Sequence, residues 1–72
     1  MDDLTRRAFV AYFRTGGIDQ PSHDSGEVEH KGLRYVVLYN INGVLAVYRV
    51  FIKAGTDTLR RMRRWPAELE TY

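Results

Sequence analysis

Hydrophobic residues dominate the middle of this chain, from Leu33 to Ile52. Both halves of that stretch are rich in β-branched and aromatic residues, which favour strands. At its centre stands Asn42-Gly43, a dipeptide preferred by the two-residue type I′ turn. The pattern therefore predicts a two-stranded antiparallel β-hairpin over residues 33–52.

Placing Asn42 and Gly43 in the turn pairs Ile41 with Val44 and assigns each side chain of the hairpin to one of two faces. One face is wholly apolar or aromatic and is expected to form the core; it consists of Leu33, Tyr35, Val37, Tyr39, Ile41, Val44, Ala46, Tyr48, Val50 and Ile52. The second face has apolar members as well, namely Val36, Leu38, Leu45, Val47 and Phe51. Because an antiparallel sheet commonly turns one polar face to water, we interpret the second apolar face as a surface for a partner.

The first residues of the chain have the pattern of an amphipathic helix. Apolar residues recur at helical spacing over residues 3–14, and arginines occupy the remaining arc. Asp2 and Asp3 stand where a helix N-terminus favours acidic side chains, and Gly16-Gly17 suits its C-terminal end. We expect a helix over residues 3–14 that packs diagonally across the wholly apolar face of the hairpin.

Residues 15–32 are rich in glycine and polar side chains, with Ile18 and Val28 as the apolar exceptions. This composition predicts a long, flexible acidic loop, and loops of that length tend to be functional or mobile. A short strand over residues 27–30 is an alternative within it. The sequence leaves open whether the loop is ordered.

The basic segment 58–65 is compatible with two structures. As a strand it would add to the hairpin, which is marginal when it has only two strands; as a helix it would be capped by Thr56 or Asp57. Pro66 ends either element, and the tail 66–72 can begin a short helix. The expected fold is a single small α+β domain over residues 1–72, α-β-β-β in order, with α-β-β-α as the alternative.

Composition limits the class of protein. A chain of 72 residues forms a small core, and the absence of cysteine excludes disulfides and suits a reducing compartment. The longest apolar run, from Val44 to Tyr48, is far shorter than the ~20 residues that span a bilayer. The start of the chain is acidic and lacks the apolar region of a signal peptide. We expect a soluble, cytoplasmic protein with no membrane partner.

Charge is distributed unevenly. Residues 1–32 carry four Lys or Arg and six acids, whereas residues 33–65 carry seven Lys or Arg and one acid, for a net charge of +6. The most basic part is the cluster Arg60, Arg61, Arg63 and Arg64, followed directly by Trp65. Guanidinium groups neutralise phosphates and an indole ring stacks on bases, so this cluster predicts a nucleic-acid site, assisted by Arg34 and Arg49.

The same residues also have an interpretation without a ligand. Arginines on a solvated edge keep a sheet from pairing with other chains, and a tryptophan commonly anchors a core. The arginines can also pair with the acids of the 19–29 loop and with Glu68 and Glu70.

Metal binding and catalysis have little support. The neighbours His23, Asp24, Glu27, Glu29 and His30 match no ligand spacing known for zinc or iron. No cysteine, nucleophile elbow or phosphate-binding loop is present. We expect a protein that is not an enzyme and has no cofactor or metal.

Two functional hypotheses remain. The first is a protein-interaction or regulatory module that forms a homodimer or docks on a protein partner through Val36, Leu38, Leu45, Val47 and Phe51. The alternative is nucleic-acid binding through the Arg60–Trp65 cluster. In general appearance the chain resembles small proteins of phages and mobile elements, although no motif identifies a family.

Overall fold

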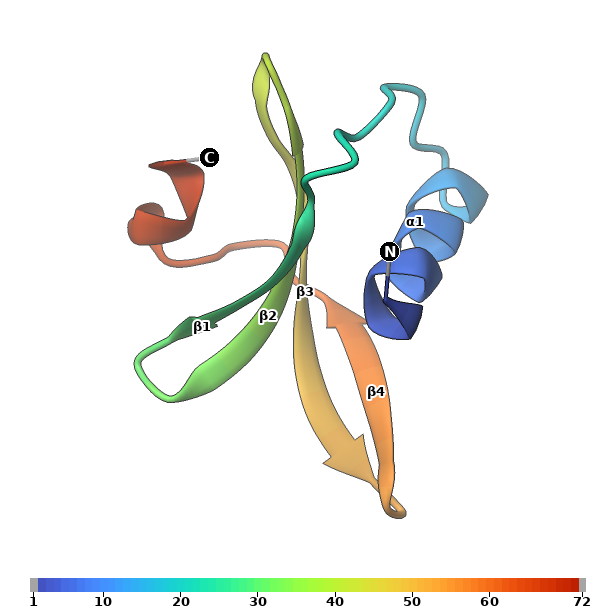
Figure 1. Cartoon of the computed structure of the whole chain (residues 1–72), viewed down its shortest axis with the longest axis vertical. Helices are drawn as coiled ribbons and strands as arrows, with labels where there is room; N and C mark the ends of the chain where they lie inside the picture. The colour runs from blue at the N-terminus through green and yellow to red at the C-terminus, as the bar shows by residue number, and fades with distance from the viewer. Residues whose placement is uncertain (1, 72) are drawn as a thin grey trace.

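The computed structural model describes residues 2–71, which form one helix, a four-stranded sheet and a final 3₁₀ helix. The elements are α1 (Asp3–Arg14), β1 (Gly26–His30), β2 (Leu33–Asn40), β3 (Gly43–Lys53), β4 (Thr56–Arg61) and η1 (Ala67–Thr71). The strands form an antiparallel meander in the order β1-β2-β3-β4. Figure 1 shows α1 on one side of this sheet and η1 on the other. The expected α+β fold, an N-terminal helix followed by a β-meander, is confirmed.

Helix α1 begins and ends where its sequence predicts. The Asp2 carboxylate caps it by accepting a hydrogen bond from the Thr5 amide at 2.7 Å. Leu4, Ala8 and Tyr12, spaced by four residues, are its buried apolar side chains. After the last turn the Gly17 amide donates to the Tyr12 carbonyl, and Gly16 has the positive φ of 98° that glycine adopts without strain.

The segment between α1 and the hairpin is anchored to the sheet. Its last residues form β1, which confirms the alternative of a short strand, and β1 pairs with β2. Ahead of β1, the buried Ser25 hydroxyl bonds both the amide and the carbonyl of Tyr39, at 3.0 and 3.2 Å, while the Ser22 amide donates to the same carbonyl.

The basic segment is a strand at its start and irregular at its end. β4 covers Thr56–Arg61, so the strand alternative is confirmed and the helix alternative is wrong for these residues. A last backbone bond joins the Met62 amide to the Val47 carbonyl. Residues 63–66 then cross to the other face of the sheet, where η1 begins directly after Pro66.

The central turn differs from the predicted one. Asn40 pairs with Gly43, so Ile41 and Asn42 form the turn and Gly43 is the first residue of β3. A type I′ turn needs positive φ at both central residues; neither Ile41 nor Asn42 has it, and only the following residue, Gly43, does, at 116°. Both positive angles occur instead in the outer hairpins, at Lys31-Gly32 and Ala54-Gly55.

A β-bulge corrects the predicted register. Tyr39 pairs with Val44 but Leu38 pairs with Ala46, which leaves Leu45 as an extra residue in β3. The rest of the hairpin is displaced by one residue from the predicted pairing, and a shift of one residue moves a strand's side chains to the opposite face. The two predicted faces are therefore wrong: Tyr48 shares a face with Val36 and Leu38, while Tyr35 and Val37 share the other face with Val47.

The sheet separates two apolar clusters. Under α1 lie Val36, Leu38, Ala46, Tyr48 and Val50, in contact with the apolar residues of the helix. On the opposite face Tyr35, Val37 and Val47 are covered by Leu69 of η1, with Met62 and Trp65 packed at the margin. The chain thus covers an apolar cluster on each face of its own sheet.

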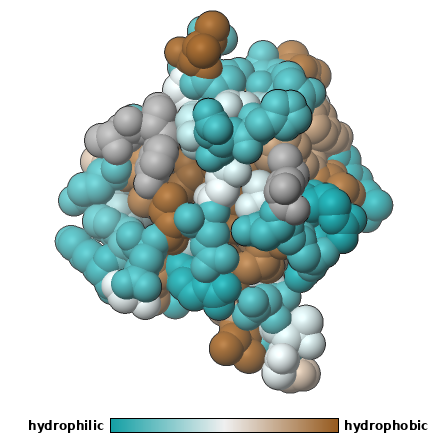
Figure 2. Space-filling view, viewed as in Figure 1, coloured by the Kyte–Doolittle hydropathy of each residue, from teal (hydrophilic) through white to brown (hydrophobic). Residues whose placement is uncertain are grey.

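The remaining exposed apolar residues lie mainly at hairpin ends and on the outer side of α1. Figure 2 shows hydrophobic colour at the upper and lower extremities of the molecule, where hairpins end in Figure 1. Ile41 in the central turn is fully exposed, and Ile52 near the end of β3 is 71% exposed. No helix within residues 2–71 is long and apolar enough to cross a bilayer.

Candidate anion-binding site

Four arginines converge where β4 ends and the chain turns toward η1. Arg60 is the last-but-one residue of β4, and its cross-strand partner on β3 is Arg49. Arg63 and Arg64 follow in the irregular segment before Pro66. Side chains alternate along a strand, so Arg49 and Arg60 project from the face opposite α1. We call Arg49, Arg60, Arg63 and Arg64 the arginine surface.

A hollow of about 330 Å³ lies in this surface. Its lining consists of all four arginines together with Arg61 and Met62. Arg49, Arg60, Arg63 and Arg64 are all exposed, so their guanidinium groups are accessible to a dissolved ligand. A site lined by several guanidinium groups attracts anions and suits oxyanions such as phosphate, because the planar group donates two parallel hydrogen bonds.

Several acids of the chain are engaged with other basic residues. Asp3 pairs with Arg6 and Arg7, and Glu27 and Asp57 both pair with Arg34. Within residues 2–71, neither a hydrogen bond nor an ion pair joins the four members of the arginine surface to a carboxylate. The alternative in which the chain's own acids neutralise this cluster is therefore not the observed arrangement.

Arg34 lies outside the site that it was expected to assist. Its guanidinium is 2.6 Å from the Glu27 carboxylate and 3.4 Å from that of Asp57, on the α1 face of the sheet. Hydrogen bonds to Glu27 first, and to Asp57 second, hold the pKa of Arg34 above its usual value. Arg34 thus joins β1, β2 and β4 in an ion-pair network, whereas Arg49 does line the hollow.

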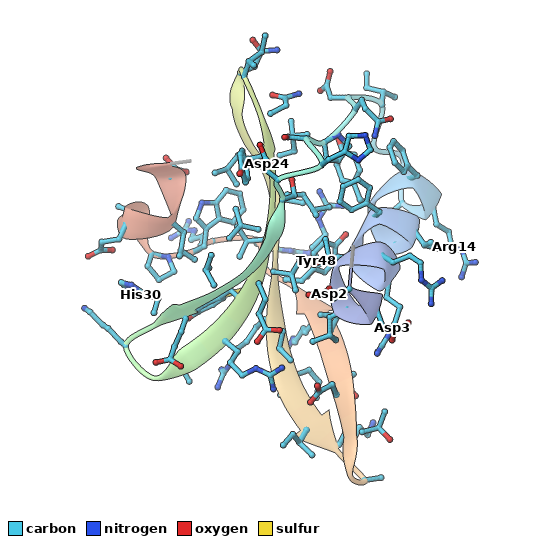
Figure 3. The ribbon with its side chains drawn as sticks, viewed as in Figure 1. Asp2, Asp3, Arg14, Asp24, His30 and Tyr48 are labelled. Carbon is cyan, nitrogen blue, oxygen red and sulfur yellow. The ribbon has the colours of Figure 1, made fainter. Side chains whose placement is uncertain are left out.

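Arg61 belongs to the fold more than to the site. It donates to the Thr15 hydroxyl at 3.0 Å, and its guanidinium carbon lies 5.9 Å from the centre of the Tyr12 ring. Such a cation–π contact holds the end of β4 against α1. Beside it, Tyr48 lies between the sheet and α1 (Figure 3), and burial raises the pKa of its hydroxyl.

Trp65 is chiefly a packing residue. Its ring packs at the margin of the cluster under η1, and its indole nitrogen donates to the Glu70 carboxylate at 3.1 Å. One side of the ring also lines a second hollow, of about 530 Å³, together with Leu45, Arg61, Met62 and Arg63. The core-anchor interpretation of Trp65 describes these contacts better than that of a free stacking ring.

Phe51 occupies an unexpected place beside the arginines. With Arg49 and Arg60 it lines a third hollow, of about 280 Å³. The sequence pattern assigned Phe51 to an apolar docking face, whereas the pairing of β3 with β4 places it beside Arg49 and Arg60. Phe51 stands two residues after Arg49 on one strand, so their shared face follows from the sequence alone. The position of Arg60 opposite Arg49 depends on the pairing of β3 with β4.

The five predicted partner-binding residues do not form one surface. Val36 and Leu38 are fully buried under α1, and Leu45 is partly buried at the edge of the same cluster. Val47 is fully buried on the opposite face. The premise of an uncovered second face is therefore wrong, while self-association as such stays a prediction.

The histidines and acids of the 19–30 region are dispersed. His23 and Asp24 are exposed in the loop, whereas His30 lies on the η1 side of the sheet (Figure 3), with its Nε2 3.8 Å from the Glu68 carboxylate. Among the residues that the structure describes, no three metal-ligating side chains come together.

Comparisons of the chain with protein-family models, with curated proteins and with solved structures gave no match.

Proposed function

We propose that this protein binds nucleic acid through the arginine surface. The observation that carries the proposal is the convergence of Arg49, Arg60, Arg63 and Arg64 on one hollow, with no carboxylate partner among residues 2–71. Clustered like charges repel one another unless an anion neutralises them. A phosphate backbone supplies such charges in a regular series.

The pattern of charge favours a polyanion over a single small anion. The four side chains come from two strands and from the segment after β4, so they spread over more than one hollow. Each guanidinium can meet a different phosphate, and binding then releases several counterions from the nucleic acid. The modest net charge of +2 is no obstacle, because attraction depends on the local cluster.

Salt dependence gives the direct test. Labelled single- and double-stranded DNA and RNA are titrated with the protein by fluorescence anisotropy at about 50 and 200 mM salt. Four phosphate contacts give a log–log slope of about −2.8 for single strands and about −3.6 for duplex, which weakens binding roughly 50- to 150-fold over that range. Absence of salt-dependent binding to every nucleic acid at micromolar protein would contradict the proposal.

A matched charge variant separates the site from net charge. Arg60→Gln with Arg63→Gln removes two charges from the hollow and is expected to reduce the magnitude of the slope by about 1.4 to 1.8. Arg14→Gln removes one charge from the outer side of α1, which Figure 3 shows pointing away from the sheet, and serves as the control. Equal losses per charge in both variants would count against a localised site.

Self-association remains a second candidate function, at a site other than the predicted one. The observation that favours it is a pair of exposed apolar residues one turn apart on α1, Val10 at 47% and Phe13 at 42% exposure. Sedimentation velocity at two protein concentrations tests it, with Phe13→Glu as the disrupting variant and Ile52→Glu as the control. A monomer at both concentrations would remove this candidate.

A further inference from the structure

Phe51 is an aromatic residue without a role in either apolar cluster. Leu4, Tyr48 and their neighbours form the cluster under α1, and Tyr35, Val47 and Leu69 form the one under η1; Phe51 packs in neither. It is half-buried on β3, opposite Thr58 of β4. Because Phe51 is only half-buried and belongs to neither cluster, part of its ring is accessible to a ligand.

The residues beside Phe51 indicate the chemistry of such a ligand. Phe51 stands two residues from Arg49 on the same strand, so the two side chains share one face with their Cα atoms about 6.8 Å apart. Arg60 of β4 lies directly opposite Arg49 and completes the hollow that the ring lines. A flat apolar ring beside two unpaired guanidinium groups matches a nucleotide, which has a flat base beside a phosphate.

The arrangement of Phe51 beside Arg49 and Arg60 suits a single strand better than a duplex. In a duplex each base face is covered by the neighbouring base pair, whereas a single strand can place a base on an aromatic ring. Duplex readers commonly insert a helix into the major groove. In the described part of the chain the only α-helix is α1, which lies on the far face of the sheet from Arg49 and Arg60 and has Asp2 as its N-cap and Asp3 as its first residue.

We propose that the ligand of the arginine surface is single-stranded nucleic acid, with a phosphate held between Arg49 and Arg60 and the adjacent base stacked on Phe51. This inference rests on the proposed function and specifies the ligand of the same site. Arg63 and Arg64 meet the phosphates that follow along the strand.

The test compares two ligands and two kinds of variant. A labelled single strand and the duplex of the same sequence and length are titrated with the wild-type protein, Phe51→Ala and Phe51→Leu. The wild-type protein is expected to bind the single strand at least tenfold more tightly than the duplex. Both Phe51 variants are expected to lose about tenfold in single-strand affinity, since leucine keeps an apolar side chain but has no ring to stack on.

The salt slope separates stacking from charge. Phe51 contributes no charge, so its variants are expected to lower the affinity and leave the slope unchanged, whereas Arg60→Gln lowers the magnitude of the slope by about 0.7. Ile41→Ala, which removes an exposed apolar side chain from the central turn, is the control and should change neither quantity. Thermal melts of each variant confirm that the fold is retained.

The outcomes keep the two proposals apart. Salt-dependent binding with equal or higher affinity for duplex, or with no loss in the Phe51 variants, would overturn the single-strand inference and leave nucleic-acid binding in place. Absence of binding to both ligands would overturn the proposed function and the inference with it.

Discussion

Arg49 on β3 and Arg60 on β4 face each other as a directly paired cross-strand couple of like charge. Such a couple is destabilising, by an amount similar to the ~0.2–1 kcal/mol that an opposite-charge pair contributes. Within residues 2–71 neither side chain has a carboxylate partner to offset the repulsion. The fold therefore tolerates a local cost at the place where a polyanion would remove it.

The first prediction concerns this couple. Arg60→Glu replaces the like-charge couple by an opposite-charge pair and is expected to raise the free energy of unfolding by roughly 0.5–1 kcal/mol, with a smaller gain at high salt. Urea denaturation at two salt concentrations measures it, with Arg14→Glu as the control. The same variant is expected to bind nucleic acid more weakly, so stability and binding change in opposite directions. A loss of stability in Arg60→Glu at low salt would show that the repulsion is unimportant.

The second prediction concerns the cover over the η1 side of the sheet. Leu69 is 3% exposed and contacts the cluster around Tyr35, Val37 and Val47. Leu69→Ala is expected to lower the free energy of unfolding by about 2–4 kcal/mol, because it removes apolar contact and leaves a cavity. Ile41→Ala, at a fully exposed turn position, is expected to change it by less than about 0.5 kcal/mol. Chemical denaturation of both variants measures the two changes in the free energy of unfolding. A similar small effect in both would mean that the Leu69 contact contributes little to stability.

The third prediction concerns the close approach of Gly17 to Tyr12. A Cβ added at Gly17 would collide with the Tyr12 ring, and that ring is buried and has little freedom to move. Gly17→Ala is therefore expected to destabilise the fold by about 1–3 kcal/mol. Gly26→Ala is the control, since its Cβ would meet nothing closer than 3.9 Å and the residue has no positive φ. Equal melting temperatures for the two variants would contradict the steric argument.

The fourth prediction concerns pH and the cap of α1. The hydrogen bond from the Thr5 amide lowers the pKa of Asp2 below its ordinary value of 3.8. A lowered folded-state pKa means that the stabilisation is present above the unfolded value and is lost as pH falls through the folded one. Asp2→Ala is expected to cost about 1 kcal/mol at pH 7, and this difference from the wild-type protein should shrink below about pH 3.8.

A second variant isolates the charge of the cap. Asp2→Asn keeps a hydrogen-bond acceptor without a titrating group, so it should retain most of the stability at pH 7 and lack this part of the pH dependence. Denaturation curves at several pH values measure all three proteins. A constant difference between wild type and Asp2→Ala from pH 7 to pH 2.5 would exclude a role for the ionised carboxylate.

Local signals in the sequence were sufficient for α1 and for the central hairpin. Helix α1 has apolar spacing, an acidic cap and a glycine stop that agree with one another, so its bounds are predicted correctly. The hairpin follows from β-branched residues around Asn42-Gly43, although the turn itself lies one residue earlier. β4 was ambiguous because Arg60, Arg61 and Met62 favour a helix by propensity, and pairing with β3 overrides that preference.

Register is where sequence reasoning failed, for a physical reason. Register is specified strongly when one face of a strand is polar, but β2 and β3 are buried on both faces, so the pattern fits two pairings equally well. The bulge at Leu45 selects one of the two pairings. It depends on three-dimensional packing, which no local sequence motif predicts. The error assigned Val36, Leu38 and Val47 to one face, although they lie on opposite faces of the sheet, and so it made covered residues look like a docking surface.

The candidate site was predictable in part. Arg60, Arg63 and Arg64 stand out by composition alone, and they do line the hollow. That Arg34 lies outside the candidate site could not be predicted, because its partners Glu27 and Asp57 come from different strands and meet it only in the folded structure. The packing of Trp65 likewise depends on Glu70 and on the fold of the chain after Pro66.

The position of Leu69 in the chain has a consequence for truncation. The buried residues of the cluster under α1 all lie between Leu4 and Val50, whereas Val47 on the other face is covered by Leu69. A chain shortened before η1 would keep every buried residue of the first cluster and lose the Leu69 contact of the second. The apolar side chains of Tyr35, Val37 and Val47 would then face water, and such a surface favours aggregation.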